Sequence, residues 1–221
     1  MSRYLTLIVL LLFPLSLTAH DIADADQALL ANGSLWAYIW VGAKHMLTGY
    51  DHLLFLTGVI FYLSDFKSIV KFITVFTIGH SITLLSATYL GFKVDEHLID
   101  AVIALSVLYK GFENLGGFEK ILKIPSPNLL AMVFSFGLIH GLGLSSRLQS
   151  FNLGNEAYLA KIISFNVGVE MGQILALIPI VFIITKWKAF KSYQSFYKAV
   201  NFYLIIAGVF LFVFQIHNFL V

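Results

Sequence analysis

The sequence contains no cysteine among its 221 residues. This absence excludes disulfides, thiolate metal sites and cysteine nucleophiles. Any metal site in this protein must therefore use imidazole, carboxylate, amide or water ligands.

Charged side chains are also scarce. Asp, Glu, Lys and Arg make up 12% of the chain, against about 25% in a typical soluble domain. Hydrophobic residues make up 59% of the chain and include 21 Phe, and the mean hydropathy is +0.87. This composition predicts an integral membrane protein whose surroundings are the lipid bilayer. The formal net charge of +2 gives no indication of a nucleic-acid partner.

The N-terminus has the pattern of a secretory signal peptide. Residues 1–19 combine a basic start at Arg3, an apolar run and small residues near Ala19. We expect cleavage after Ala19, which leaves residues 20–33 as a short, polar, extracytoplasmic segment. The alternative is a first membrane helix that stays uncleaved.

Residues 34–221 are predicted to form an all-α, polytopic membrane helix bundle. Six apolar segments each reach the roughly 20 residues that a spanning helix needs: 34–64, 68–92, 98–117, 127–146, 157–186 and 196–219. An uncleaved signal peptide would add a seventh. The first segment is long and contains Gly42 and Gly49, so we expect either a bent helix or a short interfacial helix followed by a span. Gly137, Gly141 and Gly143 in the fourth segment permit close helix approach.

The basic residues favour one orientation of this bundle. If the mature N-terminus lies outside, the inner loops hold eight lysines: Lys67, Lys71, Lys120, Lys123, Lys186, Lys188, Lys191 and Lys198. The outer loops hold three basic residues, Lys93, Arg147 and Lys161. This positive-inside bias predicts that both ends of the mature chain are extracytoplasmic.

Ionisable side chains of the kind that bind metals lie within four of the predicted spans. Counted from the segment ends, they reach a similar depth near the bilayer midplane. They are His45, Asp51, His52, His80, His140 and Glu170. An ionisable side chain at that depth costs at least about 2.5 kcal/mol. The cluster therefore predicts a shared metal or proton-relay site.

Imidazole and carboxylate ligands suit Zn, Ni, Co, Fe or Mn and disfavour Cu(I), so the sequence alone does not choose the metal.

The remaining polar residues have simpler interpretations. Lys110 and Glu113 are three residues apart and are interpreted as an intramembrane pair that neutralises itself. Interhelical hydrogen bonding is the interpretation for the others: Thr77, Thr83, Asn114, Asn166 and Gln173.

Four ordered motifs resemble the second branch of the HupE/UreJ family of bacterial membrane proteins. HMLTGYDH fits the family's His-x5-Asp-His signature at His45, Asp51 and His52. GHSITL, GLIHGLG and FNVGVEMGQ resemble its later blocks, so the resemblance covers essentially the whole mature chain. The resemblance implies a multi-pass protein of the bacterial inner membrane, related to nickel and cobalt permeases and to hydrogenase and urease accessory functions.

The first hypothesis is a permease for a divalent transition-metal ion such as nickel or cobalt. The ion would pass through the midplane site formed by the six candidate ligands. The sequence has no nucleotide-binding motif, so transport would be passive or coupled to an ion gradient. This is the function that we expect.

The second hypothesis is an intramembrane zinc hydrolase or acyl transferase that acts on a lipid or a membrane peptide. His80 and His140, with Asp51 or His52, would hold the metal. Glu170 would be the general base, and Ser81 would orient the substrate or the attacking water. The motif HGLGLSSRL favours this alternative, because the nickel-permease branch carries a second His-Gly and an acidic residue there. Haem b between His80 and His140 is a third, less favoured alternative.

Overall fold

The computed structural model describes residues 24–31, 33–61, 63, 65–149 and 158–221. The regular elements within these ranges are all helices, as the sequence predicts. The predicted signal peptide, residues 1–19, lies outside the described residues and stays a prediction. The side chain of Asp51 also lies outside the description, although its backbone belongs to a helix.

The helices follow one another with short connections. Their bounds are α2 Asp24–Ala31, α3 Leu35–Thr48, α4 Tyr50–Val59, α5 Phe66–Leu90, α6 Glu96–Asn114, the short π-helix η1 Phe118–Leu122, α7 Leu129–Leu148, α8 Tyr158–Trp187 and α9 Tyr193–Leu220. The side chains of Asp65, Asp95 and Asn128 accept backbone N–H groups at the starts of α5, α6 and α7. These N-caps satisfy donors that a helix start leaves unpaired. Gly91 ends α5 with a φ of 67°, a conformation that favours glycine.

Four of the described helices, α5, α7, α8 and α9, are long and apolar enough to cross a bilayer. They identify a multi-pass membrane protein and account for four of the six predicted spans. The first predicted span, 34–64, is divided into α3 and α4 at Gly49, whose backbone is extended (φ −69°, ψ 112°). α6, in the predicted third span, carries Asp100, Lys110 and Glu113 and is less apolar than the four. The total of six spans therefore remains a prediction.

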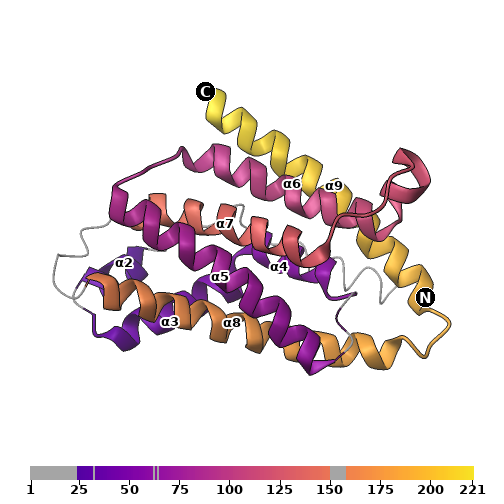
Figure 1. Ribbon diagram of the computed structural model, residues 1–221, viewed down its shortest axis with the longest axis horizontal. Coiled ribbons are helices and arrows are strands. Elements are labelled where there is room, and N and C mark those ends of the chain that lie inside the picture. The colour runs from indigo at the N-terminus through magenta and orange to yellow at the C-terminus, as the bar shows by residue number, and fades with distance from the viewer. Residues whose placement is uncertain (1–23, 32, 62, 64, 150–157) are drawn as a thin grey trace.

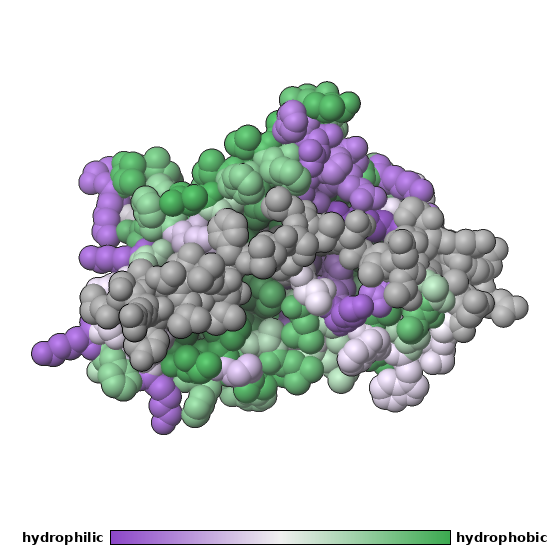
Figure 2. Space-filling view, turned by 180° about the vertical axis from the view of Figure 1, so that it is seen from behind, coloured by the Kyte–Doolittle hydropathy of each residue, from purple (hydrophilic) through white to green (hydrophobic). Residues whose placement is uncertain are grey.

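The outer surface of the bundle is apolar. Along α8, large apolar side chains are exposed at every fourth position: Leu159, Ile163, Val167, Met171 and Leu175. In Figure 2, apolar side chains form much of the surface above and below the grey atoms, and hydrophilic side chains gather at the left and toward the upper right. A stripe of this kind suits contact with lipid.

Three closely packed helix pairs build the bundle: α3 with α8, α5 with α7, and α6 with α9. Contacts between α8 and α5 and between α7 and α6 join the pairs, and Figure 1 shows α7 between the two sides of the bundle. Close approach depends on glycine, since a Cβ on Gly141 would lie 2.1 Å from the carbonyl oxygen of His80. A Cβ on Gly168 would lie 2.0 Å from that of Ile39. Such small residues permit the tight packing on which membrane helices rely.

The five residues interpreted as hydrogen-bonding links between helices do connect them. Thr77 reaches Gln173, Thr83 reaches the carbonyl of Leu138, Asn114 reaches Asn201, and Asn166 reaches His80. These bonds satisfy polar groups that lipid could not.

Candidate functional site

Three of the predicted ligands come together in the interior of the bundle. His45 of α3, His52 of α4 and His140 of α7 are 8%, 2% and 3% exposed. The ring centroids of His45 and His52 are 5.2 Å apart, and those of His52 and His140 are 4.8 Å apart. These three imidazoles, here called the histidine row, thus connect three different helices.

The break at Gly49 shapes this row. On an unbroken helix, His45 and His52 would share a face because they are seven residues apart. The extended backbone of Gly49 interrupts the helix between them, yet its N–H still donates to the carbonyl of His45 at 2.9 Å. The tight connection keeps the two rings in contact while it redirects α4 toward α6 and α9.

The hydrogen bond of His140 determines which of its ring nitrogens carries the proton in the neutral form. Nδ1 lies 2.7 Å from the carbonyl oxygen of Phe136, one turn earlier in α7. A carbonyl oxygen can only accept, so Nδ1 is the donor and Nε2 carries the lone pair. Donation from one ring nitrogen to a carbonyl is typical of a histidine whose other nitrogen binds a metal.

His80 has the same arrangement beside the row. Its Nδ1 lies 2.9 Å from Oδ1 of Asn166, and the amide nitrogen of Asn166 donates to the carbonyl of Ile162 at 3.2 Å. The second bond orients the amide so that its oxygen faces His80, which leaves the lone pair on Nε2. The ring of Phe76 packs against both His80 and the row, and its centroid lies 6.1 Å from that of His80 and 5.2 Å from that of His140.

Glu170 and Ser81 lie elsewhere, in a groove between α5 and α8. The groove has a volume of about 290 Å³ and is lined mainly by α5, including Thr74, Thr77 and Ser81, with Glu170 contributed by α8. Glu170 and Ser81 are partly exposed, in contrast to the buried histidines. Ser81 donates to Oδ1 of Asn166 at 3.2 Å, so the same amide contacts both the groove and His80.

The structure thus distributes the predicted ligands over neighbouring positions. His45, His52 and His140 form the row, His80 lies beside it with Phe76 against both, and Glu170 faces the groove. Within the described part of the chain, no three histidine or carboxylate side chains form a group that could hold a metal ion. The side chain of Asp51, next to His52 in the sequence, is not part of that description.

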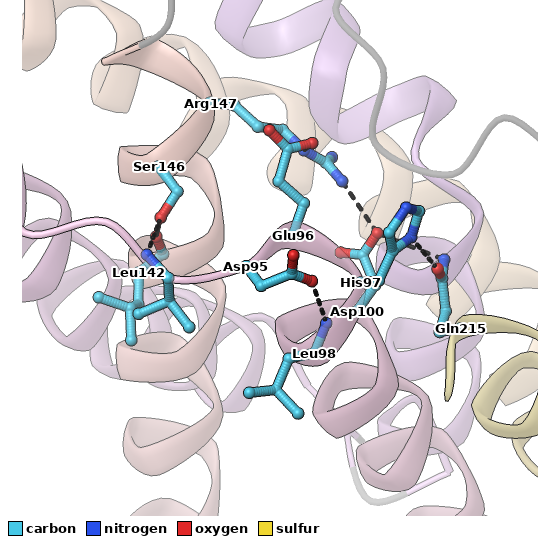
Figure 3. Close-up of polar contacts among 10 residues, drawn as sticks. Asp95, Glu96, His97, Leu98, Asp100, Leu142, Ser146, Arg147 and Gln215 are labelled. Atoms are coloured by element: carbon cyan, nitrogen blue, oxygen red, sulfur yellow. Dashed lines mark hydrogen bonds and ion pairs between the residues drawn. The ribbon is translucent and has the colours of Figure 1, made fainter. Parts of the chain in front are cut away.

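Sequence reasoning missed a second group of buried ionisable residues. Arg147, assigned to an outer loop, belongs to α7 and is 8% exposed. Figure 3 shows its guanidinium beside Asp100, with Nη2 and Oδ2 2.9 Å apart, and its Nε lies 3.2 Å from Glu96. The signal was available, because Glu96 and Asp100 are four residues apart and so share a helix face.

The neighbouring side chains complete this ion cluster, defined as Glu96, His97, Asp100, Arg147 and Gln215. Gln215 of α9 donates to Asp100 at 3.3 Å and lies 2.8 Å from Nδ1 of His97 (Figure 3). The cluster joins α6, α7 and α9 at one end of the bundle. His97 is therefore hydrogen-bonded within the cluster.

Comparison with known proteins assigns the chain to a family. The model of the HupE/UreJ proteins, in its second branch, matches residues 23–221. No curated protein and no solved structure matches the chain. The matched range contains all of the helices described above, and a helical, multi-pass chain of this family fits a membrane metal transporter. The chain belongs to the HupE/UreJ family.

Proposed function

We propose that the protein is a permease for a divalent transition-metal ion, such as nickel or cobalt, whose substrate passes along the histidine row. The single observation that carries the proposal is the contact of three buried imidazoles from three helices. Neutral imidazole is a good ligand for such metals. Ionisable side chains inside a membrane bundle are costly, so the presence of three imidazoles there favours a function.

The arrangement suits passage better than permanent retention. Transport requires sites that bind an ion well enough to admit it and weakly enough to release it. Imidazoles in a row can exchange as ligands one after another, with His80 and Asp51 as further ligands. Because His140 and His80 donate Nδ1–H to oxygen, Nε2 is the atom of each ring that would bind the ion.

We also propose an orientation for the permease in the bacterial inner membrane. The loop between α8 and α9 and the segment around η1 carry lysines, and we place that end in the cytoplasm. The ion cluster at the opposite end would then lie on the extracytoplasmic side. Metal ions would enter from that side and leave at the lysine-bearing end.

Metal flux into proteoliposomes tests the proposal. Purified protein is reconstituted, nickel or cobalt is added outside, and a metal-sensitive fluorophore inside reports uptake. We expect His52→Ala and His140→Ala to lower the flux at least about tenfold. His217→Ala, on the exposed end of α9, is the matched control and should transport like the wild type. Full flux in well-folded His52→Ala and His140→Ala would contradict the proposal.

An intramembrane zinc hydrolase or acyl transferase is the second candidate, and the groove between α5 and α8 favours it. The groove brings Glu170 and Ser81 together on a surface that lipid would contact. His80 lies behind Ser81 through Asn166, so a zinc ion on His80 and His140 could face a lipid substrate. In that case Glu170 would be the general base.

Elemental analysis of the detergent-purified protein separates the two candidates. The metal content is measured before and after dialysis against a mild chelator. One zinc per chain that survives dialysis would favour the enzyme, since a catalytic site retains its metal. Little retained metal, with weak rebinding of added nickel or cobalt, would favour the permease.

A further inference from the structure

Away from the histidine row, a second ionisable pair is buried in the bundle. Lys110 and Glu113 of α6 are 0% and 4% exposed. Nζ of Lys110 lies 2.5 Å from Oε2 of Glu113. The pair has no role in the proposed metal path, although it is among the most deeply buried ionisable sites in the described structure.

The neighbouring helices are shaped around this pair. A Cβ on Gly58 of α4 would lie 2.6 Å from Cγ of Lys110, so only glycine leaves space for the lysine stem. Asn114 donates to the carbonyl of Gly58 at 2.7 Å and to Asn201 of α9 at 2.5 Å. Tyr197 of α9 donates to the carbonyl of Asn114 at 2.5 Å.

The ion pair itself does not join two helices, because Lys110 and Glu113 both belong to α6. Amide and hydroxyl groups already connect α6 to α4 and α9. A buried ion pair is expensive to desolvate, and apolar residues of the same size often give equal or greater stability. Ionisable groups within membrane bundles often mark proton or ion pathways.

The pair lies close to the helix that carries part of the metal path. Gly58 and His52 are six residues apart on α4, which is about 9 Å along the helix axis. The Lys110 stem packs on Gly58, so it lies between one and two turns of α4 from the position of a divalent ion at His52. In a low-dielectric interior an interaction between two charges is stronger than in water.

Tyrosines of α9 and α6 accompany the pair. Among the described side chains, α9 contributes the phenol of Tyr197, which lies near Glu113. Tyr109 precedes Lys110 on α6, and its ring packs on Phe136 of α7. The part of α4 beside the pair contributes the glycine backbone of Gly58.

We propose that Lys110 and Glu113 form a proton site that exchanges one proton for each metal ion transported. The inference rests on the permease function. When the ion reaches the row, its charge expels one proton from the Lys110 ammonium toward the side from which the ion came. The pair then consists of a neutral amine and a carboxylate. When the ion leaves on the opposite side, the amine takes up one proton there.

Proteoliposomes that contain a pH-sensitive dye and a metal-sensitive dye test this exchange. Addition of nickel outside the wild type should raise the internal pH as metal enters. Lys110→Arg keeps the positive charge but does not release a proton near neutral pH. We expect it to abolish the metal-driven pH change, as should the apolar double variant K110M/E113L, which removes both charges together. E119Q, at an exposed glutamate, should behave as the wild type.

The outcomes separate this inference from the permease proposal. The double variant should still carry metal down its concentration gradient, within about threefold of the wild type. Wild-type metal flux without a rise in internal pH, or an unchanged rise in the folded double variant, would overturn the exchange alone. No wild-type metal flux would overturn the permease and the exchange with it. Circular dichroism and size-exclusion chromatography of each variant establish that it is folded.

Discussion

The histidine row and the ion cluster both bury ionisable side chains, and they satisfy them in different ways. In the row and beside it, rings donate Nδ1–H to backbone or amide oxygens and keep a lone pair. In the ion cluster, the guanidinium of Arg147 is matched by the carboxylates of Asp100 and Glu96. One region therefore offers ligands, whereas the other neutralises its own charges. We expect substitutions in the first to change transport and substitutions in the second to change stability.

The largest stability effect is expected in the ion cluster. Arg147→Ala leaves the carboxylate of Asp100, which is 7% exposed, without its guanidinium. Removing one partner of a buried pair costs on the order of 3 kcal/mol of unfolding free energy. Denaturation in detergent measures the loss, and Lys93→Ala on an exposed loop is the control. Metal flux per folded molecule should stay near the wild-type value. A large flux defect without a loss of stability would contradict the distinction between the ion cluster and the histidine row.

Close packing next to the row is the next test. Gly141→Ala would bring a methyl group to 2.1 Å from the carbonyl of His80, so α5 and α7 must separate. Such overpacking costs about 1–3 kcal/mol. It should also lower metal flux, because His80 and His140 lie on these two helices. Ala131→Val adds methyl groups on an exposed face of α7 and serves as the control. Unchanged thermal stability in Gly141→Ala would contradict the packing described here.

Asn166 tests whether hydrogen-bonded positioning matters in the ligand region. Asn166→Ala removes the acceptor shared by His80 and Ser81. Loss of such a supporting partner typically weakens metal affinity about tenfold or more. Isothermal titration with nickel or cobalt measures it. Asn166→Asp keeps an acceptor oxygen and should restore most of the affinity. If the alanine variant binds metal as tightly as the wild type, His80 does not belong to the path.

The smallest effect is expected at a helix cap outside both regions. The backbone N–H of Ser68 bonds to Asp65 and lowers the pKa of that carboxyl. A lowered folded-state pKa stabilises the protein above the ordinary aspartate pKa, and the contribution is lost as pH falls through the folded value. Melting temperatures from about pH 5 down to about pH 3 should therefore decline slightly less in Asp65→Asn, which caps without titrating. Parallel curves for the two proteins would argue against this cap.

Local patterns were sufficient to predict most of the helices. The segments 68–92 and 196–219 correspond closely to α5 Phe66–Leu90 and α9 Tyr193–Leu220, because apolar runs of spanning length leave few alternatives. The break at Gly49 was one of two alternatives, since a glycine permits a bend without requiring it. The shared face of Glu96 and Asp100 was visible in the sequence, but it did not identify Arg147 as their partner, because Arg147 lies 47 residues from Asp100.

The candidate ligands likewise show some features that the sequence predicts and others that only helix packing decides. Residue type and position within the apolar segments identified His45, His52, His80 and His140 as buried groups, because both can be read directly from the sequence. The placement of Glu170 beside Ser81, away from the row, depends on how α8 is rotated against α5. Periodicity gives the relative angles of side chains on one helix and does not give the rotation of that helix against its neighbours.

The sequence by itself therefore determined that this is a helical membrane protein, and which side chains inside it are costly enough to require a purpose. Tertiary structure alone decided that three imidazoles meet, that an arginine is enclosed by carboxylates, and that a glutamate opens onto the lipid-facing groove. The physical reason is the separation along the sequence over which each effect acts. Hydropathy and helix formation depend on neighbours along the chain, whereas contacts between polar groups depend on packing among helices distant in sequence.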